Sequence, residues 1–364
     1  MSETPMDVDF EMSKALPIWD HLPRFFKKSA IGLLDFKSRN IIRKVGLNER
    51  RIADTIPAFL SFIRVGPSSP YSSGMLTFKL PDSDCISHTV HHTQQQVIMD
   101  ALAFCSHPNY TVDIIQFTAT ALMDFTPFMT RLNQEIANRG PNFRLRADKL
   151  LWTFGADSGK MFLETLKKFE TGTLNTIQIG VPFDDDFTTV AIVDTPQWRG
   201  AKNISVLSPT EIDIEKLIHC DRILVNCHEV TIDDVLTCVE TWKEKTPSHG
   251  PDAPEFVLHS VVRVRVIRVL QYLGYEEAYR WGRNKKQYFV TYRVSPTYAF
   301  LVRIGPHTVH GFFCRLGEHL QADVRAAIPQ CPVRPRFLVL NGEGEDIVPP
   351  EEQDDDDTDF FVFL

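Results

Sequence analysis

Short β-type runs and helix-type stripes alternate between residues 59 and 259, and this alternation constrains the fold more than any other feature of the chain. The intervals are roughly 20 to 40 residues, a period typical of stacked β–α units. One such unit cannot bury its own apolar faces, so neighbouring units must pack against one another. The chain is therefore predicted to form an α/β fold. The predicted strands are Phe59–Val65, Met75–Leu80, Val112–Phe117, Lys149–Phe154, Asn175–Ile179, Asn203–Leu207, Arg222–Asn226 and Glu255–His259.

The segments between these strands carry helix signals. Apolar residues recur at helical spacing within 97–105, 128–136, 162–169 and 232–242. Pro127 suits a first helical turn, Thr231 suits an N-cap, and Gly140 and Gly172 suit helix ends. The resulting stack is leucine-rich-repeat-like in its period only, because the leucine-rich consensus with its Asn or Cys step is absent. A single open α/β sheet is the alternative.

The pattern changes to long β-type runs after residue 276. These runs cover 287–294, 297–304 and 309–315, with a turn at Gly305-Pro306. We expect them to close the sheet, because a repeat array needs a terminal unit. A last helix is predicted over Leu316–Ile328.

The segment 16–54 differs from the rest because it predicts three short helices and no strand. Leu22-Pro23 opens the first helix, the second covers Phe36–Val45 between Asp35 and Gly46, and the third runs from Asn48 through Ile52. The apolar stripe of the first helix is Phe26, Ala30, Ile31 and Leu34. About forty residues cannot bury a stable core alone. An apolar face must therefore be covered, either by the rest of this chain or by a partner protein.

The acidity of the chain is concentrated in its last residues. The net charge is −8, yet residues 341–364 hold ten Asp or Glu and no Lys or Arg, which leaves +2 on residues 1–340. We predict a disordered acidic tail over 341–364. The apolar run Phe360–Leu364 that follows the acidic residues is predicted to add to a sheet edge or to engage a peptide groove.

Cysteine usage and hydropathy predict an intracellular protein, without separating cytosol from nucleus. The seven cysteines are an odd number without tight clustering, which indicates reduced thiols and not a disulfide scaffold. Residues 1–12 lack the charged and apolar regions of a signal peptide. No run of about 18 apolar residues exists, so no membrane span is expected.

The helical segment resembles an F-box of the divergent nematode type. The matching residues are Trp19, Leu22-Pro23, Ile31, Leu34-Asp35-Phe36, Ser38-Arg39 and Arg43-Lys44-Val45. An F-box implies docking onto the Skp-type adaptor of an SCF ubiquitin ligase, which also contains a cullin scaffold. The adaptor contacts implied by the resemblance are Leu22, Pro23, Ile31, Leu34, Ile42 and Val45.

The region 163–248 is similar to the FTH domain that follows the F-box in many nematode proteins. That family has a Gly-Thr-Leu step before an Ile-x-Ile strand, and here Gly172-Thr173-Leu174 precedes Ile177 and Ile179. A Gln-Trp element followed by Ala-Lys comes next, at 197–202. The resemblance implies an F-box at 16–56, a target-binding β–α domain at 57–340 and the tail beyond it. It implies a non-catalytic substrate receptor whose target is unknown.

No catalytic or cofactor site is predicted. The sequence GADSGKMF at 155–162 resembles a phosphate-binding loop, but it has one residue too few and Met161 in place of the metal-binding hydroxyl. We interpret it as an ordinary strand-to-helix turn with Asp157 or Ser158 as cap. His219-Cys220 and Cys227-His228 flank one predicted strand about 20 Å long and are too far apart for a single zinc ion. His88, His91 and His92 are interpreted as a surface cluster in a loop.

A second possible partner site is basic. It comprises Arg263, Arg265, Arg268, Arg283, Lys285 and Lys286. The residues around 263 alternate with valines, which favours a half-buried strand with its arginines in solvent. An acidic protein segment is one ligand that would suit such a patch. RNA is another, so the alternative to a ligase receptor is a non-ligase interaction scaffold, with an RNA-associated version. Binding of nucleic acid is the less favoured version.

Overall fold

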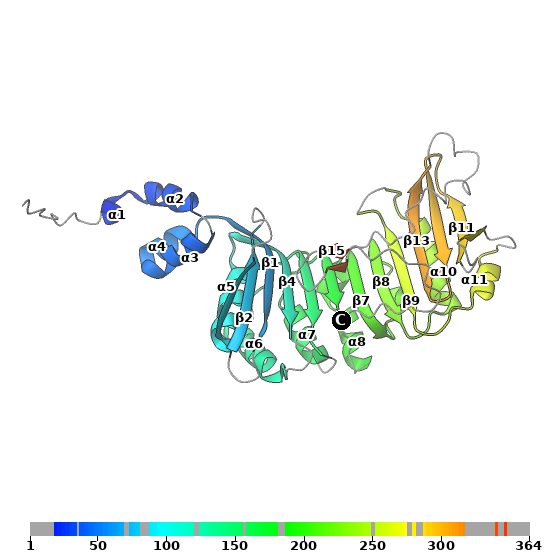
Figure 1. Ribbon diagram of the computed structural model, residues 1–364, viewed down its shortest axis with the longest axis horizontal. Coiled ribbons are helices and arrows are strands. Elements are labelled where there is room, and N and C mark those ends of the chain that lie inside the picture. The colour runs from blue at the N-terminus through cyan, green and yellow to red at the C-terminus, as the bar shows by residue number, and fades with distance from the viewer. Residues whose placement is uncertain are drawn as a thin grey trace, which may run out of the picture. The chain divides into compact units, whose positions relative to one another are not determined.

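The chain divides into two compact units in the computed structural model shown in Figure 1. The smaller unit comprises residues up to Ala58 together with Pro108–Tyr110, and the larger comprises the rest. The structure describes residues 18–34, 36–68, 73–80, 87–119, 124–155, 158–180, 186–248, 252–274, 279–281, 287–316, 339–340 and 346–347.

The described part of the smaller unit up to Ala53 consists of four short helices. Its helices are α1 Ile18–His21, α2 Arg24–Gly32, α3 Phe36–Val45 and α4 Leu47–Ala53. Gly46 does not end α3 in the expected left-handed conformation. Its φ of −166° is extended, and it is the N-cap of α4, because only this one residue separates the two helices. The predicted cap Asp35 lies outside the described residues.

The larger unit is a mixed α/β structure with one large open sheet. Over the described residues this sheet has thirteen strands in the order β10-β11-β12-β13-β9-β8-β7-β6-β5-β4-β1-β2-β3. Their bounds are β1 Ala58–Pro67, β2 Ser73–Lys79, β3 Ser87–Thr93, β4 Tyr110–Thr118, β5 Lys149–Thr153, β6 Thr176–Ile179, β7 Asn203–Thr210, β8 Arg222–Cys227, β9 Glu255–Ser260, β10 Tyr279–Trp281, β11 Gln287–Arg293, β12 Tyr298–Ile304 and β13 Thr308–Arg315.

The strands β4 to β9 are parallel and follow one another in chain order. Between them run helical segments, several of which lie along one side of the sheet (Figure 1). Parallel neighbours require a crossover connection of this kind, since a tight turn cannot reverse the chain twice. The helical segments of the larger unit are α5 Gln94–Ser106, α6 Thr126–Asn138, α7 Gly159–Leu166, α8 Asp186–Val193, α9 Pro196–Gly200, the 3-10 turn Ile214–Lys216, α10 Ile232–Lys243 and α11 Val266–Tyr272.

The helices cover one face of the parallel strands. Trp152 on β5 contacts Phe162 on α7, with ring centroids 5.2 Å apart, and Phe256 on β9 contacts Trp242 on α10 at 5.6 Å. The row opposite to this face is buried as well. It is paired in register and consists of Leu151, Gln178, Ser205, Leu224 and Val257. Burial on both faces explains why these strands are almost continuously apolar in sequence.

Both ends of the parallel series change to antiparallel pairing. β9 pairs with β13, which continues through β12 and β11 to β10, and the β1–β2–β3 meander lies beyond β4. The predicted runs after residue 287 are confirmed as β11, β12 and β13. The predicted helix at 316–328 lies almost wholly outside the described residues.

Two local predictions are wrong. The histidines at 88, 91 and 92 belong to strand β3, not to a loop, because β2 supplies a full antiparallel partner for this segment. The alternating valines and arginines at 262–266 do not form a strand; β9 ends at Ser260, and Val266 begins helix α11. Thr231, in contrast, is confirmed as a cap, because its side chain and that of Asp234 form a reciprocal capping box.

The tail predicted to be disordered over 341–364 contains one short strand, Asp346–Ile347 (β15), which pairs antiparallel with Val339–Leu340 (β14) just before the tail. The other residues of 341–364 lie outside the described residues. The expectation that all thiols are reduced is wrong for Cys314, which is disulfide-bonded. Among the helices described, none combines the length and apolar character needed to cross a bilayer.

Candidate protein-interaction surface

The smaller unit has a core of its own. Ile31, Ile52, Ala53 and Ile56 are buried together, and Trp19 and Ile42 pack against them. Inward-facing residues of α2 are Lys27 and Ile31, four positions apart and therefore on one side of the helix. The predicted stripe through Phe26 and Ala30 is therefore wrong in its direction, because both of these side chains are exposed.

A buried polar contact fixes α2 against α4. The Lys27 ammonium lies 3.6 Å from the Glu49 carboxylate, and the Trp19 indole donates to the same oxygen at 3.2 Å. Lys27 also lies over the Trp19 ring, 5.7 Å from its centroid. A backbone hydrogen bond, together with Trp19 and Lys27, holds the pKa of the Glu49 carboxyl below its ordinary value, against the opposing effect of burial. The charged form of Glu49 is therefore favoured by folding.

We expect Glu49→Gln to lower the free energy of unfolding at pH 7 by about 1 kcal/mol, because hydrogen bonds to the charged carboxylate are weakened. A depressed folded-state pKa contributes stability above the ordinary Glu pKa of about 4.3, and this contribution is lost as pH falls through the folded-state pKa. We therefore expect a smaller deficit in acid, at about pH 3, than at pH 7. Urea unfolding of the full chain at both pH values, with exposed Glu240→Gln as control, measures it; an undiminished deficit in acid would contradict the charge assignment.

Two arginines tie the loops of the smaller unit to its helices. The Arg39 guanidinium donates to the carbonyl oxygens of Leu34 and Gly32, both at 2.7 Å, and of Pro57 at 3.2 Å. The Arg43 guanidinium lies 2.7 Å from the Asp54 carboxylate. These contacts hold the α2–α3 connection and the end of α4, so the surface that the helices present is well defined.

That surface is apolar. Leu33 is 90% exposed, Val45 is 69% exposed and Phe25 is 64% exposed. We call the set the helical-unit surface, and it consists of Phe25, Phe26, Leu33, Ile41, Val45 and Leu47. Single exposed apolar residues are common on soluble proteins, but six within 23 residues make this set a candidate interaction surface.

The residues predicted to contact an adaptor occupy different environments. Val45 and Pro23 are exposed, Leu22 and Leu34 are half-buried, and Ile42 packs against the core. Ile31 is fully buried, so its role in this structure is in the core and not at a surface. Phe25, Leu33 and Leu47 were missed by the sequence analysis. The exposure of Leu33 could have been predicted from its position directly after Gly32, the last residue of the helix, because a side chain there no longer belongs to the inward-facing side.

A second candidate surface is a basic hollow beside α11, with a cavity volume of about 530 Å³. We call it the α11 hollow; it is lined by Arg263, Val264, Arg265, Val266, Ile267, Arg268, Tyr288 and Pro306. The three arginines of the predicted basic patch that are described thus lie together and are exposed, whereas Arg283, Lys285 and Lys286 lie outside the described residues.

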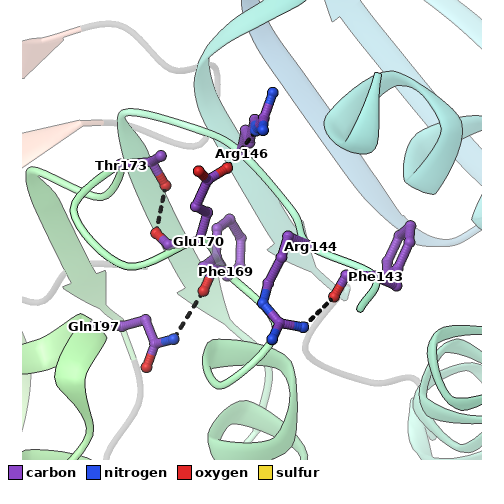
Figure 2. Close-up of polar contacts among 7 residues, drawn as sticks. All are labelled: Phe143, Arg144, Arg146, Phe169, Glu170, Thr173 and Gln197. Carbon is purple, nitrogen blue, oxygen red and sulfur yellow. Dashed lines mark hydrogen bonds and ion pairs between the residues drawn. The ribbon is translucent and has the colours of Figure 1, made fainter. Parts of the chain in front are cut away.

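A second hollow, of about 610 Å³, is also rich in arginine, but its charged groups already have partners (Figure 2). Arg146 forms an ion pair with Glu170, and Arg144 donates to the carbonyl oxygen of Phe143 at 2.8 Å. Arg139 lies over the Phe143 ring, 5.0 Å from its centroid. This network joins the α6–β5 connection to the loop after α7, so we assign it a structural role.

The phosphate-loop-like sequence is part of the core. Ser158 is fully buried, and its hydroxyl accepts a hydrogen bond of 2.8 Å from the Trp152 indole; it does not cap α7 with its side chain. Asp157 lies outside the described residues.

The predicted metal-ligand types are not gathered into a site. Among the residues that the structure describes, no group of three His, Cys, Asp or Glu side chains is placed to hold a metal ion. Burial raises the pKa of the Cys220 and Cys227 thiols to about 12, so these sulfurs stay protonated at neutral pH. Protonated thiols are poor metal ligands and poor nucleophiles.

The elements that suggested the FTH family are also structural. Leu174, Ile177 and Ile179 are buried around β6. Trp198 is fully buried, and the Gln197 amide donates to the Phe169 carbonyl oxygen at 2.8 Å, which is visible in Figure 2. These residues therefore explain how the sheet is packed and do not themselves form a binding surface.

Comparison with known families gives one match. Residues 151–247 match the FTH domain, which begins in β5 and extends past α10. No curated protein and no solved structure matches the chain. The match confirms the FTH part of the resemblance and covers the central parallel strands.

Proposed function

We propose that this chain is the substrate receptor of an SCF-type ubiquitin ligase. In this proposal the helical unit is an F-box that binds a Skp-type adaptor, and the adaptor connects it to a cullin. The larger α/β unit binds the target protein. Support comes from the helical-unit surface, together with the FTH match at 151–247, a family typically linked to F-box proteins.

The observation that carries the proposal is a small helical unit with an internal core and a second, uncovered apolar set. Ile31 and Ile52 are buried in that core, while Leu33, Val45 and Leu47 remain exposed. Exposed apolar side chains on rigid helices lose little conformational entropy on association, so they suit a stable protein interface. The receptor itself would contribute proximity between target and ligase.

The sheet supports the receptor role of the larger unit. We interpret its parallel strands β4 to β9 as a leucine-rich-repeat-like stack, because they follow in chain order with a helical connection after each. Such arrays present broad surfaces suited to protein recognition.

Leu33→Glu or Val45→Glu is expected to reduce recovery of the Skp-type adaptor with the full-length chain about thirtyfold, since a buried charge at an interface hot spot costs about 2 kcal/mol or more. Both side chains are exposed, so the fold should persist. Affinity purification of the tagged chain followed by quantification of adaptor and cullin measures the change.

Val190→Glu is the matched control, because Val190 is 58% exposed but belongs to α8 of the larger unit. Full adaptor recovery with the Leu33 and Val45 variants would refute the assignment of this surface. Absence of adaptor with the unaltered chain would favour the second candidate, a non-ligase interaction scaffold. The exposed arginines of the α11 hollow support the RNA-associated version of that candidate.

A further inference from the structure

We propose that the α11 hollow binds residues 351–364 of the same chain. These residues read EEQDDDDTDFFVFL, so they combine seven acidic side chains with an apolar run, Phe360–Leu364. The inference concerns the larger unit and does not depend on adaptor binding by the smaller one. It rests on the charge, the exposed apolar area and the backbone support of the hollow.

Within the part of the chain that the structure describes, the charge of the hollow is uncompensated. Arg263, Arg265 and Arg268 are exposed, and no acidic side chain is among the lining residues. None of the three guanidinium groups forms an ion pair or hydrogen bond within the described part of the chain. The exposed Arg199 differs, because it lies 2.6 Å from Asp194. Three unpaired arginines within six residues are a site for carboxylates, since guanidinium–carboxylate hydrogen bonds are charge-assisted and often bidentate.

The same segment exposes apolar side chains. Ile267 lines the hollow and is 57% exposed, and Tyr272, five residues further along α11, is 66% exposed. Val261 and Val262 on the other side of the arginines are exposed as well. Four of the nine large exposed hydrophobic residues described in the larger unit thus fall within 261–272. A ligand for this surface needs apolar groups in addition to negative charge.

The backbone of the segment is held in place. The Val262 N–H donates to the His228 carbonyl oxygen at 3.0 Å, and the Val264 N–H donates to that of Pro306 at 2.7 Å. The Ser260 hydroxyl donates to the Val262 carbonyl oxygen at 2.6 Å. The arginines therefore extend from a backbone that is fixed by hydrogen bonds. A ligand that binds them does not have to order this segment first.

Residues 351–364 match this surface in both respects. The acidic residues of 351–359 complement the arginines, and the run at 360–364 complements Ile267 and Tyr272. A ligand on the same chain has an effective concentration in the millimolar range, so even a weak contact is populated. A second copy of the chain would have to bind at micromolar concentration, which the exposed and salt-screened charges do not favour.

Photo-crosslinking in the full-length chain tests the proposal. Tyr272 is replaced by p-benzoylphenylalanine, and the crosslinked peptide is identified by mass spectrometry. We expect the crosslink to join residue 272 to residues within 351–364 in a product of monomer mass. Arg263→Glu combined with Arg268→Glu should reduce its yield about tenfold, and so should replacement of Asp354, Asp355, Asp356 and Asp357 by Asn.

Lys160→Glu on α7 is the matched control and should leave the yield unchanged, because Lys160 is exposed but is not among the lining residues. Crosslinks to other parts of the chain, or an unchanged yield in both charge variants, would overturn the proposal. Crosslinked dimers would overturn the same-chain assignment. Adaptor recovery is expected to be normal in the variants of the hollow, so failure here is separable from failure of the proposed function.

Discussion

Trp152→Ala is expected to lower the free energy of unfolding by about 3–5 kcal/mol, the cost of deleting a buried aromatic side chain. Trp152 is fully buried on β5, with ring centroids of Phe117, Phe154 and Phe162 between 5.1 and 5.5 Å away. The substitution would open a cavity between the sheet and α7. It would also leave the buried Ser158 hydroxyl without its indole donor.

Urea unfolding followed by circular dichroism measures this loss. Ser158→Ala is the informative companion, because it keeps the ring and removes only the acceptor of the 2.8 Å hydrogen bond. We expect it to cost about 1–3 kcal/mol, the penalty of an unpaired buried donor. A Trp152→Ala variant as stable as the unaltered chain would show that β5 and α7 do not pack as described. A neutral Ser158→Ala would contradict the structural role assigned to the 155–162 turn.

Gly66→Ala is expected to destabilise the larger unit by about 3 kcal/mol or more, because overpacking that meets backbone has little room to relax. A Cβ atom at Gly66 would lie 1.9 Å from the Thr118 carbonyl oxygen. Arg64, two residues earlier on β1, donates to the Gln116 side chain at 3.0 Å, so these positions lie side by side on the neighbouring strands β1 and β4. The glycine permits their close approach.

Gly200→Ala is the control for this prediction, since no atom beyond its chain neighbours and its own helix backbone lies within 4 Å of the position its Cβ would take. Thermal unfolding of both variants gives the comparison. The control should unfold within about 0.5 kcal/mol of the unaltered chain, as most substitutions without steric conflict do. Equal stability of the two variants would refute the close approach of β1 to β4.

The parallel strands were predictable because burial on both faces leaves a strong mark on the sequence. Runs such as 149–154 and 222–226 are short, apolar and bounded by turn residues, and they coincide with β5 and β8. β3 was not predictable. Its sequence SHTVHHT has no apolar face, and it is a strand only because β2 offers a full row of backbone partners at the end of the sheet.

The segment at 262–266 shows the opposite failure. Its alternation of Val and Arg has the period of a strand, yet tertiary hydrogen bonds to His228 and Pro306 take the backbone groups that a strand would have paired. The result is a braced turn and helix α11. Sequence periodicity depends on which side chains are apolar. It carries no information about which distant backbone groups are available as hydrogen-bond partners.

The candidate surface on the helical unit was only partly predictable for a related reason. The predicted apolar stripe of α2 did not include Lys27, yet its stem and ammonium are covered by Trp19 and Glu49, which lie thirty residues apart in sequence. Once Lys27 and Ile31 face inward, Phe26 must face outward. The inward face of α2 therefore differs from the face that its hydrophobic pattern predicts, because it includes the buried charge of Lys27. Predicting this face would have required knowing that Glu49 lies next to Lys27.

The order of strands β4 to β9 has a consequence for how such a protein can change in evolution. Because each parallel strand pairs with the next one in the chain, a duplicated β–α segment can be inserted without rerouting any connection. Each insertion would separate the β1–β3 meander from the β10–β13 meander by about 4.8 Å, the spacing of adjacent strands. The number of parallel strands thus determines the distance between the two antiparallel meanders at the ends of the larger unit.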